Sequence, residues 1–211
     1  MRVKGPIIAS AASMVLAAIS LPAQSLNIDF GSREGTPSSG FGAAAHQAGA
    51  WNTLDLGATG SLLGLSGAPT AVRATVTAGA GDGWYPDCTG DVVALVGDNF
   101  FTFQGDWSVI LTGLENGPYL AFLYGPINPA VPTGSMTANG LLVASVSGDT
   151  CDLSAGVSHA SVVVTVTDGT LTIVGEPTQP SPDFAGLAGL QLKILPPLRP
   201  LRRALKGTKV W

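Results

Sequence analysis

An aromatic pair in a polar, glycine-rich stretch is the feature of this 211-residue chain best suited to binding chemistry. Trp84 and Tyr85 are adjacent, so strand alternation cannot turn both side chains into one core. A flat ring is the surface on which the C–H face of a sugar packs, and the flanking carboxylates of Asp82 and Asp87 can accept hydrogen bonds from hydroxyls. The stretch from Gly81 to Asp91 therefore predicts an exposed glycan-binding loop. The alternative is that Trp84 covers the edge of the core.

The two cysteines are the second feature of this kind. Cys88 and Cys151 both lie in polar turn segments between apolar runs. An even number of cysteines in an exported chain favours pairing. We therefore predict a disulfide between Cys88 and Cys151, which needs Cα atoms about 5.5 Å apart. No C-x-x-C pair or histidine cluster supports a zinc site.

A structural calcium ion is a further hypothesis, and it depends on this disulfide. The bond would gather five aspartates at one end of the molecule, where like charges repel unless they are neutralised or solvated. Calcium is the oxygen-seeking cation that exported domains meet. Solvated turn aspartates are the alternative, because the spacing does not match an EF-hand loop. The five residues are Asp82, Asp87, Asp91, Asp149 and Asp152. We expect no other cofactor.

Residue patterns for catalysis are sparse. A serine hydrolase needs a histidine beside its nucleophile, but His46 and His159 are the only histidines and no G-x-S-x-G segment is present. We expect each to be a surface or turn histidine. A glycosidase needs two facing carboxylates. Glu115 and Glu176 precede turn residues, which leaves Glu34 in the first long loop. We therefore expect no catalytic residue and no enzyme, with a glycoside-active enzyme as the remaining alternative.

The N-terminus indicates export. Arg2 and Lys4 precede an apolar stretch of 15 residues from Ile7 to Leu21, and Ala23-Gln24-Ser25 is a small-x-small cleavage signal. We predict a signal peptide over residues 1–25, cleavage after Ser25, and a secreted, extracellular or cell-envelope location. A membrane anchor is the alternative, but the apolar stretch is shorter than the ~20 residues that span a bilayer. We expect no membrane span.

Charge is divided unevenly along the chain. All 14 acidic residues lie between Asp29 and Asp183, where Arg33 and Arg73 are the only basic residues. An acidic body repels phosphate backbones, so we expect no nucleic-acid partner. The last 19 residues hold six basic residues and no acidic one. We predict that residues 196–211 form a basic, disordered tail, which is either solvated or in contact with an acidic surface.

The body, residues 26–195, has the pattern of one all-β domain. The whole chain holds 28 glycines and 15 prolines, and the apolar residues of the body recur with period two in short runs between turn residues. We predict an antiparallel β-sandwich of jelly-roll type with about eleven strands. The predicted strands cover residues 26–30, 51–56, 71–78, 92–96, 100–103, 107–112, 119–124, 141–146, 161–167, 170–174 and 189–195.

Some aromatic residues and one loop complete this prediction. We expect Trp51, Trp107, Phe101 and Phe103 in the core, because they lie in strand-like runs, and the hydroxyls of Tyr119 and Tyr124 at its edge. Residues 31–49 are rich in Gly, Ser and Ala. They predict a long loop, too small and polar for the core.

An ordered series of short motifs gives the body a resemblance to known domains. The motifs are Asn27-Ile28-Asp29-Phe30-Gly31, Gly49-Ala50-Trp51-Asn52, Val109-Ile110-Leu111-Thr112-Gly113-Leu114 followed by residues 119–124, Asp168-Gly169-Thr170-Leu171-Thr172-Ile173, and Gly186-Leu187-Ala188-Gly189-Leu190-Gln191-Leu192. With them the chain resembles secreted bacterial domains of planctomycete type, which are similar to galactose-binding-like and malectin-like β-sandwiches. The resemblance covers about residues 26–195. It implies a carbohydrate-binding or cell-surface module and not an enzyme.

These features together predict the function. We expect a secreted, non-catalytic carbohydrate-binding or cell-surface module that binds glycans weakly through the aromatic loop, with a glycan or cell-surface polymer as its partner. The alternative is a structural or adhesive cell-envelope protein with no small-molecule ligand. Domains of the resembled type often end in a sorting segment. This chain has the basic tail there instead, so the mode of surface attachment stays open.

Overall fold

Two large β-sheets form the body of the protein. The structure is a computed structural model that describes residues 24–77, 80–84, 88–103, 105–125, 134–143, 151–177 and 185–196. The five-stranded sheet contains, in spatial order, β11 (His159–Val166), β8 (Gly117–Tyr124), β14 (Gly189–Ile194), β1 (Leu26–Phe30) and β2 (Trp51–Leu54). The six-stranded sheet contains β10 (Leu141–Val143), β9 (Ser135–Ala138), β12 (Thr170–Glu176), β7 (Trp107–Thr112), β4 (Pro69–Thr77) and β3 (Thr59–Leu63).

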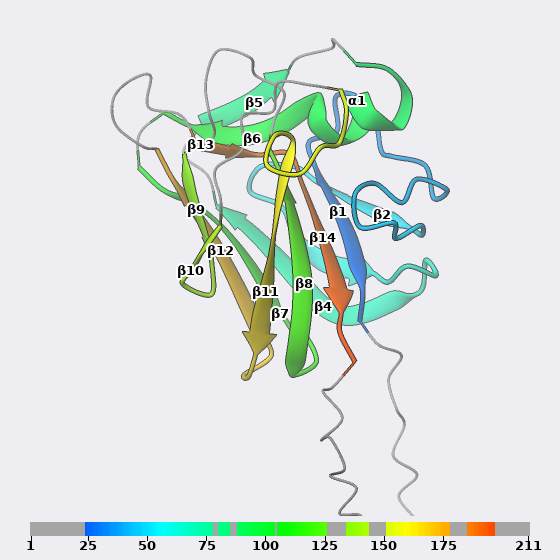
Figure 1. Ribbon diagram of the computed structural model, residues 1–211, viewed down its shortest axis with the longest axis vertical. Helices are drawn as coiled ribbons and strands as arrows, with labels where there is room; N and C mark the ends of the chain where they lie inside the picture. The colour runs from blue at the N-terminus through cyan, green and yellow to red at the C-terminus, as the bar shows by residue number, and fades with distance from the viewer. Residues whose placement is uncertain are drawn as a thin grey trace, which may run out of the picture.

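A third, smaller sheet and a short helix lie across one end of these two sheets (Figure 1). The small sheet contains β13 (Ala185–Leu187), β6 (Asp98–Thr102) and β5 (Ala80–Trp84), and the helix is α1 (Gly90–Val96). Among the described residues, the paired strands are antiparallel, apart from the parallel pair of β1 and β2. The antiparallel β-sandwich is therefore confirmed, although strands β1 to β14 exceed the eleven expected.

The core between the sheets follows the alternation of the sequence. In β4, Val72, Ala74 and Val76 are buried while Arg73 and Thr75 are exposed. The same alternation buries one face of β7 and one face of β12. Burying each large apolar side chain stabilises the fold by roughly 1.5–3 kcal/mol. This repeated burial is what joins the two sheets.

A close contact between two strands explains why one position in the core is glycine. β12 pairs with β7 so that Gly175 lies opposite Trp107. A Cβ on Gly175 would lie 2.1 Å from Cε2 of the fully buried Trp107 ring. The indole therefore occupies the place of a side chain, which only glycine permits.

One predicted strand is a helix. The run Val92–Val96 belongs to α1, which buries Ala94, Leu95 and Val96 and leaves Asp91 half-buried in its first turn. A short apolar run is compatible with either element, and its tertiary partners decide between them. Here the helix covers the end of the sandwich, next to β1 and β6 (Figure 1).

Three further expectations need correction. The predicted loop from Gly81 is partly strand, because β5 pairs with β6 through backbone groups that need no side chain. Phe103 is 54% exposed, since β6 ends at Thr102 and the chain leaves the sheet there. Residues 31–49 do form a loop, but it enters the core, with Ala45 and Gln47 at least nine-tenths buried.

Both described chain ends lie at the same end of the sandwich. Leu26 pairs with Leu192, and the Ser25 hydroxyl accepts a hydrogen bond from the Ile194 amide. Tyr124, the last residue of β8, pairs with His159 and Gly189 at the opposite end. In Figure 1 the small sheet, the helix and the loops lie at that upper end, and the chain ends lie below.

Some predictions fall outside the described residues. They are the signal peptide, apart from Gln24 and Ser25, and the basic tail, apart from Pro196. Among the described residues, no helix has the length and apolar character needed to cross a bilayer.

Candidate binding site

The predicted aromatic site is described only in part. Asp82 and Trp84 lie in β5, where their backbones pair with Phe100 and Asp98 of β6. Their side chains, together with Tyr85 and Asp87, lie outside the described residues. Glycan binding by this group of four therefore stays a prediction.

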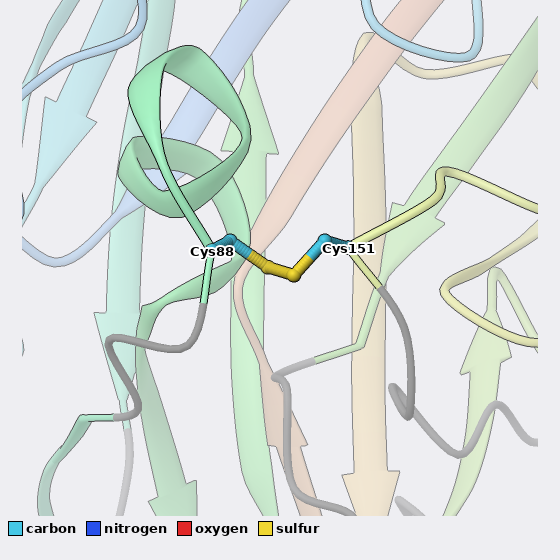
Figure 2. Close-up of a disulfide and its surroundings, with 2 residues drawn as sticks. All are labelled: Cys88 and Cys151. Atoms are coloured by element: carbon cyan, nitrogen blue, oxygen red, sulfur yellow. A yellow bond between two sulfur atoms is a disulfide. The ribbon is translucent and has the colours of Figure 1, made fainter.

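The predicted disulfide is confirmed. The Cα atoms of Cys88 and Cys151 are 5.5 Å apart and the sulfur atoms are bonded (Figure 2). Cys88 is buried in a small apolar cluster with Trp51 and Tyr124, directly before α1. Cys151 continues into the segment that leads to β11. The bond therefore ties this segment to the helix at the loop end of the sandwich.

Of the five aspartates in the calcium hypothesis, only Asp91 and Asp152 have described side chains. Asp91 accepts hydrogen bonds from the backbone amide and the hydroxyl of Ser38, at 2.6 and 2.8 Å. Asp152 is exposed next to the disulfide. Asp149 lies outside the described residues. Among the residues that the structure describes, no group of three or more His, Cys, Asp or Glu side chains is arranged to hold a metal ion. The calcium site stays an untested hypothesis.

A cavity of about 510 Å³ lies beside the disulfide-bound segment. One wall comes from the loop between β1 and β2, and the other from the segment between Cys151 and β11. The described lining residues are Phe41, Gly42, Ala43, Ala44, His46, Leu153, Ala155 and His159. It brings the two histidines of the chain together, although they are separated by more than a hundred residues in the sequence.

The loop wall of the cavity has an unusual backbone. Ala43 and His46 have positive φ angles of 44° and 50°, a conformation that is uncommon for residues other than glycine. Such backbone strain persists only where the surrounding structure fixes it, and it is frequent at functional sites. Here the strained residues line the cavity themselves.

A buried polar network fixes this loop to the five-stranded sheet. The Gln191 side chain of β14 donates to the Gly42 carbonyl at 3.2 Å and accepts from the Ala45 amide at 3.2 Å. The Tyr124 hydroxyl donates to the same Gln191 oxygen at 2.5 Å and accepts from the Ala44 amide at 2.9 Å. The hydroxyl of Tyr124 is therefore buried under the loop. This corrects the expectation that it lies at the edge of the core.

Two further amides complete the network. The Asn27 side chain donates to the Gln47 carbonyl at 3.0 Å, and Gln47 donates back to Asn27 and to two backbone carbonyls. Gln191 also donates to Asn27, at 2.8 Å. A fully hydrogen-bonded buried network rigidifies the chain around it. The cavity wall is therefore formed before any ligand binds.

The two histidines differ in environment. His46 is an exposed turn residue, as expected. His159 is only 6% exposed, which corrects the expectation of a surface histidine. Burial lowers its pKa, and its ring lies 5.9 Å from that of Phe122 and 5.6 Å from that of Tyr124. Its Nδ1 atom is buried without a hydrogen-bond partner among the described residues. His159 is therefore a neutral imidazole at pH 7.

Two carboxylates are buried elsewhere, between β1 and β6. Asp29 and Asp98 are both fully buried, and Asp98 accepts a hydrogen bond from the Glu34 amide at 2.9 Å. Asp29 has one oxygen without a described partner, and the other accepts a long bond of 3.5 Å from Thr53. Burial, and then the neighbouring Asp98, raises the pKa of Asp29 to about 10. Asp29 is therefore protonated at neutral pH.

Sequence reasoning did not find the cavity. Its two walls meet only in the folded chain, and one of them comes from a loop that was expected to lie outside the core. The usable signal was the series of small residues from Gly42 to Ala45, which lets a backbone pack closely. At Gly42, a Cβ would lie 3.0 Å from the Gln47 amide nitrogen.

Comparisons with known proteins show likenesses of fold only. No family model matches the chain, and no curated protein matches it. The crystal structure of the plant receptor-like kinase FER is 11% identical, with a TM-score of 0.49, and the match covers 82% of this chain and 42% of FER. The complex of the plant peptide RALF23 with FER and LLG2 is 14% identical (TM-score 0.48), with coverage of 83% and 40%.

A bacterial enzyme gives a similar result. Bacteroides uniformis beta-glucuronidase 2, covalently bound to cyclophellitol-6-carboxylate aziridine, is 16% identical with a TM-score of 0.47. The match covers 81% of this chain but only 18% of that enzyme. This chain thus spans less than half the length of each of the three solved chains. The relation to planctomycete domains stays a prediction.

Proposed function

We propose that this protein is a secreted, non-catalytic module that binds a glycan in the cavity between the loop at Phe41–His46 and the segment at Leu153–His159. The observation that carries the proposal is the cavity, whose volume of about 510 Å³ falls within the range of small-ligand sites. Its loop wall is held by buried hydrogen bonds, so binding orders few groups.

Phe41 is the side chain suited to the sugar face. Its ring stacks on Trp51, with centroids 6.2 Å apart and an interplanar angle of 28°, and the Trp51 indole donates to the Phe41 carbonyl at 3.1 Å. A ring fixed in this way offers a rigid apolar surface to sugar C–H groups. The imidazoles of His46 and His159 supply hydrogen bonds to hydroxyls or ring oxygens.

The absence of catalysis is part of the proposal. Glycoside hydrolysis uses two carboxyl groups on opposite sides of the scissile bond. The described residues that line the cavity include no Asp or Glu. This composition supports binding without turnover.

The position of the cavity supports a surface role. The Tyr124 end of β8 lies near the cavity, and Tyr119 pairs with Ile194 at the end where the chain enters and leaves the sandwich. The five residue steps from Tyr119 to Tyr124 span roughly 17 Å along the strand. A domain attached to a surface through either terminus would therefore present the cavity outward.

A glycan array with the secreted protein tests the proposal. We compare the wild type with Phe41→Leu, which keeps an apolar side chain but removes the ring, and with Phe103→Leu, which removes an exposed aromatic ring at another position. We expect weak binding that multivalent display strengthens. Phe41→Leu should weaken it at least 5-fold, and Phe103→Leu should leave it unchanged. Absence of binding to any glycan, or equal binding by both variants, would refute the proposal.

The aromatic pair stays a second predicted contact for the same ligand. Trp84 and Tyr85 would stack on the glycan, with Asp82 and Asp87 as hydrogen-bond acceptors. Trp84→Ala should then reduce binding without unfolding the sandwich. A stability loss of about 3 kcal/mol or more, the scale of a deleted core aromatic, would show that Trp84 belongs to the core.

The calcium hypothesis has its own test. If calcium bridges aspartates near the disulfide, a chelator should lower the melting temperature of the protein. An unchanged melting temperature would end that hypothesis without affecting the glycan proposal.

A further inference from the structure

We infer that export leaves Gln24 as the first residue of the mature chain, and that Gln24 then closes into a pyroglutamate ring. This inference assigns a processing site and a modification site. It rests on the predicted signal peptide and is independent of what the cavity binds.

The sequence offers two cleavage points to a signal peptidase. The cut follows the apolar stretch and comes directly after a small residue. The apolar stretch ends at Leu21, and the Ala, Gly or Ser residues between it and β1 are Ala23 and Ser25. The small-x-small pattern by itself favours the cut after Ser25. The contacts of the folded chain favour the cut after Ala23, because they use the two residues that the other cut removes.

Gln24 is part of the folded domain. It is only 6% exposed, and its side-chain oxygen Oε1 accepts a hydrogen bond from the Glu115 amide at 2.8 Å. Glu115 lies between β7 and β8, so this bond ties the start of the domain to a turn of the other sheet's neighbour strand. A cut after Ser25 would remove the acceptor of a part-buried amide, which is unfavourable.

Ser25 is engaged in the same way. Its hydroxyl accepts from the amide of Ile194, the last residue of β14, at 3.2 Å. The next residue, Leu26, is fully buried and pairs with Leu192. A cut after Ser25 would place a charged α-ammonium group on Leu26, and a buried charge without a partner is costly. A cut after Ala23 keeps both side-chain contacts and puts the new chain end two residues before β1.

A chain that begins with glutamine can close on itself. The α-amino nitrogen of Gln24 attacks its own side-chain carbon Cδ, so that an N–Cδ bond forms and the Cδ–Nε2 bond breaks. Nε2 takes one proton from the amine and leaves as ammonia. Every reacting group belongs to Gln24, so the step needs no co-reactant and no change of oxidation state. The product is a lactam, and the chain end then carries no charge.

The fold is compatible with this product. The atom of Gln24 that holds the Glu115 amide is Oε1, which the lactam keeps as its carbonyl oxygen. The reaction removes Nε2 and spares the acceptor. A blocked end also resists aminopeptidases, which need a free α-amino group. The modification would therefore preserve the two residues that join the chain start to Glu115 and Ile194.

Peptide mapping by mass spectrometry tests both parts of the inference. The full chain is expressed in a host with a general secretion pathway, and the exported protein is incubated at neutral pH before digestion. We expect the N-terminal peptide to begin at Gln24 and to have lost one ammonia. Pyroglutamate aminopeptidase should then remove a single residue and expose Ser25 as the new N-terminus.

Two variants separate the cut from the ring closure. Ser25→Leu removes the small residue of the alternative cleavage point, and it should still be cut after Ala23. Gln24→Met has a side chain of similar length without an amide, so its N-terminal peptide should begin at residue 24 with a free amino group and no loss of ammonia. Both readouts are covalent, so they stay valid if either variant folds poorly.

Each outcome decides one part of the inference. A wild-type chain that begins at Leu26, or a Ser25→Leu chain that is no longer cut after Ala23, would overturn the processing site. A free α-amino group on Gln24 after the incubation would overturn the ring closure. An exported chain that retains residues 1–23 would overturn both, whereas the glycan array would still decide the proposed binding function.

Discussion

Replacing the buried Asp29 by asparagine should stabilise the protein at neutral pH. Asp29 is fully buried beside Asp98, and one of its carboxyl oxygens has no described hydrogen-bond partner. Burial, and then the Asp98 charge, raises its pKa from 3.8 to about 10. The folded state therefore holds a proton that the unfolded chain releases at about pH 4.

The sign and size of the effect follow from this difference. Because the folded pKa is raised, the contribution of Asp29 to stability is complete below pH 4 and is lost as the pH rises toward 10. At pH 7, about three units above the unfolded value, the loss reaches at most ~4 kcal/mol at ~1.4 kcal/mol per unit. Relaxation of the protein around Asp29 makes this loss of stability smaller. We expect Asp29→Asn to raise the free energy of unfolding by about 1–4 kcal/mol at pH 7 and by almost nothing near pH 4.

Urea denaturation between pH 4 and pH 8 measures the free energy of unfolding of the wild type and of Asp29→Asn. The exposed Asp106, which lies just before β7, provides the matched control. Asp106→Asn should change stability by less than ~0.5 kcal/mol, as surface substitutions usually do. If Asp29→Asn is no more stable than the wild type at pH 7, and its stability has the same pH dependence, Asp29 is ionised in the fold and the reasoning is wrong.

Three further predictions concern the disulfide, the cavity and the core. Replacing both Cys88 and Cys151 by serine should cost about 4 kcal/mol, the chain-entropy value for their separation of 63 residues, and chemical denaturation that shows no loss would contradict this. Burial lowers the pKa of His159, so the wild type should lose stability as the pH falls below about 6.5, where the unfolded chain gains a proton first. A pH titration of melting temperature should find this loss absent in His159→Gln. Gly175→Ala should destabilise by about 1–3 kcal/mol or more, because its methyl group would overlap the Trp107 ring; an unchanged melting temperature would show that the ring can move.

Some features could be predicted because their cause is local. The alternation in β4 and in β11 identifies a half-buried strand wherever it occurs, since side chains on successive strand residues point to opposite faces. Repeated strands with short turns then predict the sandwich. Cys88 and Cys151 have only each other as partners, so the disulfide needed no knowledge of the fold.

Other features depended on contacts between distant segments. The run Val92–Val96 has the composition of a strand, and it is helical because its apolar face covers the end of the sandwich. The loop between β1 and β2 has residues too small and polar to predict a place in the core, yet Gln47 is buried because Asn27 and two backbone carbonyls pair with its side chain. Such long-range partners cannot be read from residue types alone.

The sequence by itself determined the β class of this protein and its disulfide, because period-two burial and a single pair of cysteines are local or combinatorial signals. Only the tertiary structure decided where a ligand could bind. His46 and His159 lie in segments that the chain brings together through the disulfide and the buried Gln191 network. The physical reason is that a cavity is a property of surfaces that meet in space, whereas the sequence specifies each surface separately.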